Sequence, residues 1–209
     1  MILFVPAIMP QPLTEPSYHL PAFYDLWARW GPTADRAFWS RAADVSRAFF
    51  VKTTNPTTAL APVYANFDGT PHQTRFAQST VFGYDSWRTA SNWSVDWSWW
   101  QKAPHEQELS DRIQRFFASQ GIDTYGPVYT LAGKPLGATT GLTHEDHPAG
   151  LVGTNAIAGL AATDKLRTTQ FTEALWNTPI PSAQNRYYDG MLYLMSLMHV
   201  SGWFRIWAP

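Results

Sequence analysis

Residues 87–100 read WRTASNWSVDWSWW and hold several of the eleven tryptophans of this 209-residue chain. On a helix that begins near Asp85, a step of about 100° per residue collects polar and aromatic groups on one narrow stripe. The stripe consists of Asp85, Arg88, Asn92, Asp96 and Trp99. A polar line flanked by buried indoles is expected of a helix that lines a cleft, and aromatic faces beside fixed polar groups suit a sugar ring. The alternative is a buried helix whose few polar groups satisfy one another.

Composition excludes several classes of protein. The net charge is −1 and no basic patch stands out, which argues against a nucleic-acid partner. The absence of cysteine excludes disulfides and thiolate chemistry. The opening residues MILFVP are apolar but lack a basic region and soon meet prolines, so they predict a short buried strand and neither a signal peptide nor a membrane span. We therefore expect a cytoplasmic protein, and the abrupt apolar start suggests the later part of a longer chain.

Helical periodicity and its breakers predict a mainly α fold and a single domain over residues 1–209. A small β-hairpin with a glycine turn is predicted over residues 128–136. We expect about seven helices packed as antiparallel pairs, over residues 16–30, 35–55, 83–101, 104–121, 148–162, 166–177 and 187–202.

Several separate motifs resemble one family of enzymes. These motifs are FGYDSWR at 82–88, EPSYHLPAFY at 15–24, YANFDGT at 64–70, GID at 121–123 and YYDGMLY at 187–193. Together they resemble glycoside hydrolase family 8, in particular its exo-oligoxylanases that release xylose from the reducing end. The resemblance implies an inverting hydrolase of β-1,4-linked xylo-oligosaccharides that needs no cofactor.

The resemblance also implies a fold and a site. The family fold is an (α/α)6 barrel of six inner and six outer helices, so about seven helices correspond to a partial barrel, its C-terminal portion. Asp85 matches the family's general base, and Arg88 matches the arginine that supports it. Tyr18 matches a tyrosine that contacts the sugar and the nucleophilic water, and Tyr188 belongs to the wall of the same cleft.

The family's general acid is a glutamate that precedes the segment seen here. The glutamates of this chain are poor replacements. Glu15 sits in a proline-rich segment and Glu145 in a loop. The other three lie on helix faces that look exposed, namely Glu106, Glu108 and Glu173. Without an acid the chain alone is expected to be at best a feeble hydrolase, because acid assistance is worth about 10²–10⁴ in rate. A half-barrel should also expose apolar helix faces, which predicts self-association or a missing N-terminal half.

Two further positions are candidates for substrate binding. His147, followed by Pro148, resembles a loop that closes one end of the cleft in exo-acting members. Trp99 is the indole that shares the stripe of Asp85. His144, Glu145, Asp146 and His147 could suggest a metal, but four adjacent loop residues rarely converge on one ion, so no metal site is predicted.

Two other functions stay open at this stage. The chain could be an inactive fragment or a non-catalytic carbohydrate-binding remnant. It could also be an endo-β-1,4-xylanase or glucanase on the same scaffold.

Overall fold

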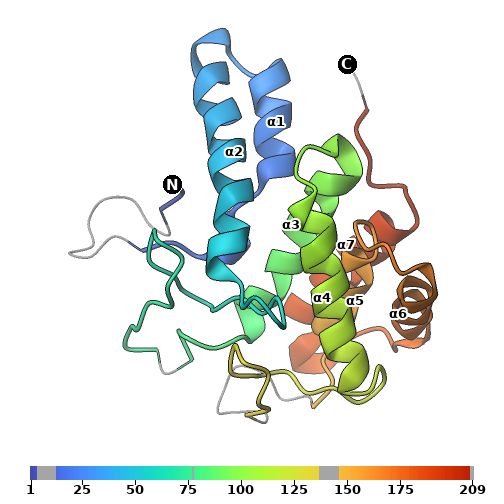
Figure 1. The fold of residues 1–209 in the computed structure, drawn as a ribbon. Coiled ribbons are helices and arrows are strands. Elements are labelled where there is room, and N and C mark those ends of the chain that lie inside the picture. Colours follow the sequence, from blue (N-terminus) through green and yellow to red (C-terminus); the bar gives the residue numbers. More distant parts are fainter. Residues whose placement is uncertain (4–12, 77, 137–145, 208–209) are drawn as a thin grey trace.

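The computed structural model describes residues 1–3, 13–76, 78–136 and 146–207 (Figure 1). The mainly α prediction is confirmed, and each predicted helix is present. The described residues form seven α-helices: α1 Pro21–Trp30, α2 Arg36–Thr53, α3 Arg88–Trp100, α4 His105–Ser119, α5 Ala149–Ala158, α6 Lys165–Asn177 and α7 Tyr188–Val200. In the part of the chain that the structure covers, none of these helices has the length and apolar content of a membrane span.

The first helix begins later than predicted. A short 3-10 turn, η1, spans Pro16–Tyr18, and α1 begins only at Pro21. Proline fits the first position of a helix but disfavours a helical conformation in the residue before it, here Leu20. At the next helix, the side chain of the N-cap residue Asp35 makes no capping hydrogen bond.

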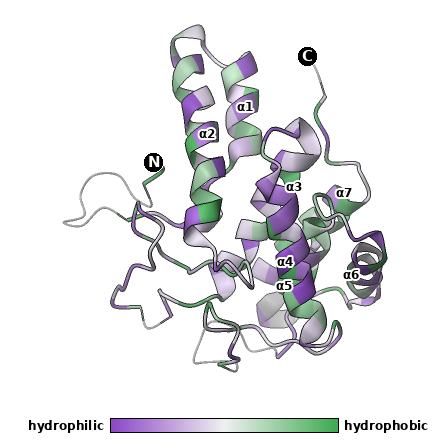
Figure 2. Cartoon of the chain, in the orientation of Figure 1, coloured by the Kyte–Doolittle hydropathy of each residue, from purple (hydrophilic) through white to green (hydrophobic). Residues whose placement is uncertain are grey.

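Helix α5 lies in the interior, packed against α3, α4, α6 and α7, while α1 and α2 form a hairpin that extends beyond the other helices (Figure 1). All ten residues of α5 are buried. Helix α4, in contrast, carries hydrophilic and hydrophobic residues on different faces, seen as mixed colours in Figure 2. One hydrophobic cluster joins side chains from α2 to α6, including Phe50, Trp93, Phe117 and Phe171, and Leu192 of α7 packs against it.

Small residues let α5 approach α7 closely. A Cβ atom added to Gly153 would lie 2.4 Å from Ser196 Oγ, and one added to Gly150 would lie 2.8 Å from Asp189 Oδ1. The backbone N–H of Gly150 donates to Asp189 Oδ1 at 2.7 Å. This contact fixes the first turn of α7 against the first turn of α5.

The predicted β-hairpin is not confirmed as a pair of strands. The segment turns at Gly133, and Leu136 N–H donates to the carbonyl oxygen of Val128 at 3.0 Å, but only isolated β-bridges are formed there. One of them pairs Tyr129 with Phe82. The segment therefore supports the chain just before Asp85.

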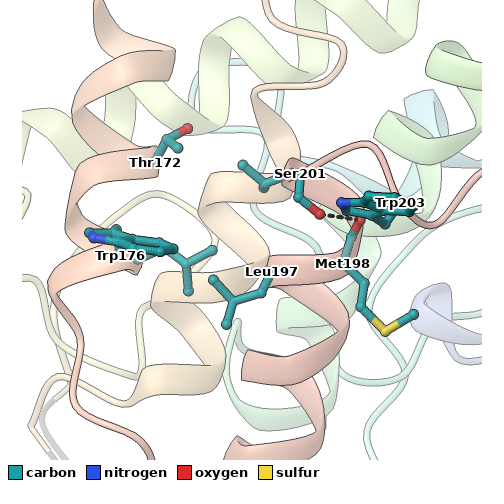
Figure 3. Close-up of a pocket in the computed structure, with 8 residues that line it drawn as sticks. Thr172, Trp176, Leu197, Met198, Ser201 and Trp203 are labelled. Atoms are coloured by element: carbon teal, nitrogen blue, oxygen red, sulfur yellow. Dashed lines mark hydrogen bonds between the residues drawn. The ribbon is translucent and has the colours of Figure 1, made fainter.

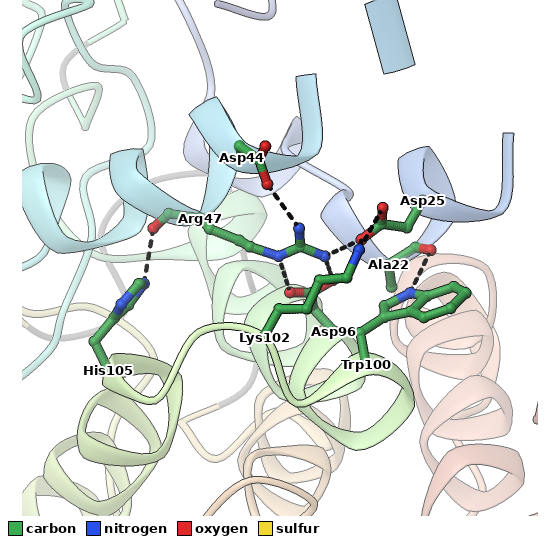
Figure 4. A network of polar contacts seen from close by, with 8 residues as sticks. All are labelled: Ala22, Asp25, Asp44, Arg47, Asp96, Trp100, Lys102 and His105. Carbon is green, nitrogen blue, oxygen red and sulfur yellow. Dashed lines mark hydrogen bonds and ion pairs between the residues drawn. The ribbon is translucent and has the colours of Figure 1, made fainter. Parts of the chain in front are cut away.

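Buried charges join the first helices near the C-terminal end of α3 (Figure 4). Arg47 of α2 donates from Nε to Asp96 Oδ2 at 2.7 Å and from Nη2 to Asp96 Oδ1 at 2.8 Å. The same guanidinium pairs with Asp25 of α1, and Lys102 reaches both oxygens of Asp25 at 2.9 Å. We call these four residues the Arg47 cluster.

Glu106 differs from its expected place on an exposed helix face. Its side chain is fully buried beside Asp96, not on an exposed helix face. Burial and the charge of Asp96 raise the pKa of Glu106 to about 10. The two cations of the Arg47 cluster therefore face two carboxylates and one neutral carboxyl group.

An apolar groove runs between α6 and the end of α7 (Figure 3). Trp176 and Trp203 lie on opposite sides of it, with Leu197 between them. The groove has a volume of about 490 Å³, and the two indoles are 77% and 71% exposed. We call it the α6–α7 groove. An exposed apolar surface of this kind is typical of an interface.

Candidate active site

The predicted catalytic residue Asp85 lies in a 3-10 turn, η3, that spans Tyr84–Trp87 and runs directly into α3. Tyr84 has a positive φ of 47°, a conformation that costs a non-glycine residue about 1–3 kcal/mol and is often found at active sites. Trp87 holds the turn in the core, because its Nε1–H donates to the carbonyl oxygen of Pro127 at 3.0 Å. The backbone before α3 therefore fixes the position of Asp85.

Asp85 is held by two donors and stays open to solvent. Arg88 Nη2 lies 2.7 Å from Asp85 Oδ1, and the hydroxyl of Tyr188 donates to the same oxygen at 3.2 Å. Burial raises the pKa of Tyr188, so this hydroxyl keeps its proton. The Asp85 side chain is 25% exposed. The turn thus presents an oriented carboxylate to water.

Tyr188 comes from the first turn of α7, far along the chain. Its ring stacks on Tyr84 with centroids 4.2 Å apart, and its hydroxyl also donates to the carbonyl oxygen of Tyr84 at 3.2 Å. The next residue, Asp189, accepts the hydrogen bond from Gly150 of α5. The position of Tyr188 is therefore tied to the packing of α7 on α5.

Arg88 links Asp85 to η1. Its Nη2 contacts Glu15 Oε1 at 2.9 Å and Ser17 Oγ at 3.0 Å, in addition to Asp85. The guanidinium carbon lies 5.7 Å from the ring centroid of Tyr18. Arg88 is an oriented cation between two carboxyl groups.

Tyr18 lies at the open side of this group, with 39% of the residue exposed. Tyr24 donates from its hydroxyl to the carbonyl oxygen of Tyr18 at 2.8 Å, and Asn92 donates to the carbonyl oxygen of Ser17 at 2.8 Å. These bonds fix η1 on α1 and α3. The structure thus brings Asp85, Arg88, Tyr18 and Tyr188 into one place.

Glu15 is a member of this group that sequence reasoning missed. Its side chain has no exposed surface, and Oε1 accepts hydrogen bonds from Ser17 and Arg88. Burial, together with the charge of Asp85, raises the pKa of Glu15 to about 7, against the opposite effects of Ser17 and Arg88. Its place three residues before Tyr18 within the quoted motif was the available signal.

Trp99 and Asp96 do not join this group, although they share a helix stripe with Asp85. Trp99 packs against Phe23 and Phe204, with ring centroids 5.2 and 6.0 Å away. Asp96 is fully buried in the Arg47 cluster. The cleft interpretation therefore fits the first turns of α3, up to Asn92, and the buried-helix interpretation fits the rest.

His147 also lies apart from Asp85 in its described contacts. Its Nδ1 lies 2.9 Å from the carbonyl oxygen of Tyr125, and its ring packs edge-on against Tyr125 at 4.4 Å. His144 and Glu145 lie outside the described residues. Within residues 1–3, 13–76, 78–136 and 146–207, no three histidine or acidic side chains gather as metal ligands would.

The chain is similar to known proteins over nearly all of its length. The family model for glycosyl hydrolases family 8 matches residues 11–202. The reducing-end xylose-releasing exo-oligoxylanase Rex8A of Paenibacillus barcinonensis is 39% identical over 208 residues, which are 99% of this chain and 52% of that protein. A reducing end xylose-releasing exo-oligoxylanase of Halalkalibacterium halodurans is 37% identical over 209 residues, which are 51% of its length.

A solved structure agrees with these matches. A GH8 xylobiose complex from Teredinibacter turnerae superposes with a TM-score of 0.87 at 46% identity, covering 94% of this chain and 48% of that one. The chain spans about half the length of the curated relatives that it matches. These matches and the helical architecture show that the chain belongs to glycosyl hydrolases family 8 and has the fold of a partial (α/α)6 barrel.

Proposed function

We propose that this chain carries the general-base half of an inverting glycoside hydrolase that releases xylose from the reducing end of β-1,4-linked xylo-oligosaccharides. The observation that carries the proposal is the Asp85 carboxylate, oriented by Arg88 and Tyr188 and open to solvent beside the exposed ring of Tyr18. The names of the relatives support the substrate class.

Inversion requires a base that activates water on the face of the sugar opposite the leaving group. Arg88 and Tyr188 occupy Asp85 Oδ1, so we assign the nucleophilic water to Oδ2. The ion pair with Arg88 fixes the orientation of the carboxylate that accepts the proton of the water. Tyr18 supplies an aromatic face and a hydroxyl group at the open side of the site.

Glu15 does not serve as the general acid in this proposal. An inverting pair keeps its carboxyl groups roughly 6.5–9.5 Å apart, so that a water fits beside the sugar. Glu15 Oε1 and Asp85 Oδ1 contact the same Arg88 nitrogen at 2.9 and 2.7 Å, which brings them closer together than that. The Glu15 side chain is also fully buried, so it cannot reach a leaving oxygen. We propose that the acid lies outside these 209 residues.

A substrate that needs no acid tests the base by itself. β-Xylobiosyl fluoride releases fluoride without protonation, so the chain should hydrolyse it, and fluoride release measured with an electrode should be lost in Asp85→Asn. Glu108→Gln, at an exposed position on α4, is the matched control. Xylotriose binding in calorimetry without any fluoride release would favour the carbohydrate-binding remnant over the hydrolase.

Product analysis tests the exo assignment. An exo enzyme converts xylotriose to xylose and xylobiose and leaves polymeric xylan almost untouched. Rapid shortening of polymeric xylan would instead support an endo-acting enzyme.

A further inference from the structure

One nitrogen atom joins the two carboxyl groups of the site. Arg88 Nη2 lies 2.7 Å from Asp85 Oδ1, 2.9 Å from Glu15 Oε1 and 3.0 Å from Ser17 Oγ. We propose that Glu15 is a positioning residue that holds the Arg88 guanidinium against the base Asp85. The proposal rests on the role of Asp85 given above and extends it to a buried second carboxyl group.

Burial assigns different tasks to the two carboxyl groups. The side chains of Asp85 and Arg88 are 25% and 29% exposed, whereas that of Glu15 has no exposed surface. Glu15 therefore cannot touch a sugar or the attacking water. It acts on the reaction through the groups around it, chiefly the Arg88 guanidinium that it contacts.

The surroundings of Glu15 make it a firm anchor. Ser17 donates its hydroxyl proton to Glu15 Oε1, and Asn92 of α3 holds the carbonyl oxygen of Ser17 at 2.8 Å. Without Glu15, Arg88 would retain mainly its ion pair with Asp85, three residues away along a partly exposed turn. Pairs of that kind restrain long side chains weakly. The buried acceptor therefore keeps Arg88 in one orientation.

Glu15 also faces a group of other charges and hydroxyls. Asp85 and Arg88 lie against it, and Tyr18 and Tyr64 are close enough to respond to its charge. Burial raises the pKa of Glu15 to about 7. Its Oε2 accepts no hydrogen bond from a described residue, so we assign the proton to this oxygen.

Protonation of Glu15 then changes how strongly Arg88 pairs with the base Asp85. Below pH 7 the carboxyl group is neutral, and among the residues that the structure describes Asp85 is then the only carboxylate paired with Arg88. Above pH 7 the ionised Glu15 competes for the same guanidinium.

Carboxyl NMR tests the link without any catalysis. The chain has only five glutamates, so selective ¹³C labelling gives a simple titration, and Glu15→Gln identifies the Glu15 signal. We expect this signal to titrate near pH 7 in the wild type and at lower pH in Asp85→Asn, because the repelling charge is gone. A Glu15 signal that titrates at the same pH in both proteins would overturn the proposal.

Kinetics on β-xylobiosyl fluoride tests the consequence. Glu15→Ala should lower kcat about 100-fold with KM within about threefold of wild type, since misplacement by about 1 Å has such effects. Glu15→Gln keeps an acceptor oxygen and should retain wild-type activity at pH 6. Because it cannot ionise, its rate should not show the change around pH 7 that the ionisation of Glu15 causes in the wild type.

Three results separate the explanations. A Glu15→Gln variant as weak as Glu15→Ala, or a Glu15→Ala variant as active as Glu108→Gln, would refute positioning. Melting followed by circular dichroism shows whether each variant is folded. A wild-type chain without Asp85-dependent fluoride release would refute the proposed function, while the NMR titration would still decide whether Glu15 and Asp85 are linked.

Discussion

Replacing Arg47 by methionine should destabilise the chain far more than any exposed charge does. The Arg47 side chain is 5% exposed and makes two hydrogen bonds with Asp96, whose side chain has no exposed surface. The substitution leaves Lys102 to compensate Asp25, but Asp96 loses both of its guanidinium bonds (Figure 4). Removing one partner of a buried ion pair costs about 3–5 kcal/mol.

That loss is large against the roughly 5–15 kcal/mol of total stability that such a protein has. At roughly 2–4 °C per kcal/mol for a chain of this size, the melting temperature should fall by roughly 6–20 °C. Urea unfolding at pH 7, followed by tryptophan fluorescence, measures the change in free energy directly. Circular dichroism gives the melting temperature of the same samples.

Asp44→Asn is the matched control, because Asp44 pairs with the same arginine at 3.2 Å but is 73% exposed. It should lose less than about 1 kcal/mol. If Arg47→Met lost no more than Asp44→Asn, the charges of the Arg47 cluster would be solvated, and its assignment as a buried structural link between α1, α2 and α3 would be wrong.

Three further outcomes are expected. The raised pKa of Glu106, about 10, means that the folded chain keeps a proton that the unfolded chain loses above about pH 4.5, so the stability of the wild type falls as pH rises. In urea unfolding between about pH 5 and 8, the stability of Glu106→Gln relative to wild type should therefore rise by up to about 1.4 kcal/mol per pH unit. A stability difference between the two proteins that stays constant with pH would contradict this. Gly153→Ala should lose about 1–3 kcal/mol, because its Cβ would lie 2.4 Å from a side-chain oxygen of α7, whereas Gly190→Ala meets nothing within 4 Å and is the control. The chain should self-associate through the α6–α7 groove, and replacing Trp176 and Trp203 by glutamine should shift light scattering toward the monomer; a wild-type monomer at every concentration would argue against this.

Sequence periodicity predicted the helices well, because local spacing of apolar residues and the punctuation by proline and glycine are enough to define them. The environment of each polar residue was harder to predict. An ideal helical wheel places Asp85 and Asp96 at nearly the same azimuth, but eleven residues of helix separate them by about 16 Å along the axis. Helix α2 covers one end with Arg47, and η1 and α7 flank the other. A helical wheel contains no information about these neighbours.

Glu15 shows the same limit at the site itself. Its burial arises from contacts between segments more than seventy residues apart, as in its bond with Arg88. A glutamate between prolines therefore looked like an ordinary loop residue. The resemblance to the family led to Asp85, Arg88 and Tyr18, while local sequence alone did not distinguish Asp85 from a helix-capping residue.

Two consecutive residues of α7 connect the interior of the protein to Asp85, the proposed base. Asp189 accepts a hydrogen bond from the backbone N–H of Gly150 in α5, and the hydroxyl of Tyr188 donates a hydrogen bond to Asp85. A shift of α7 along α5 would therefore move the Tyr188 hydroxyl that orients Asp85, even with no sugar bound. In the proposed reaction, the orientation of Asp85 therefore depends on how closely α7 packs against Gly150 and Gly153 of α5.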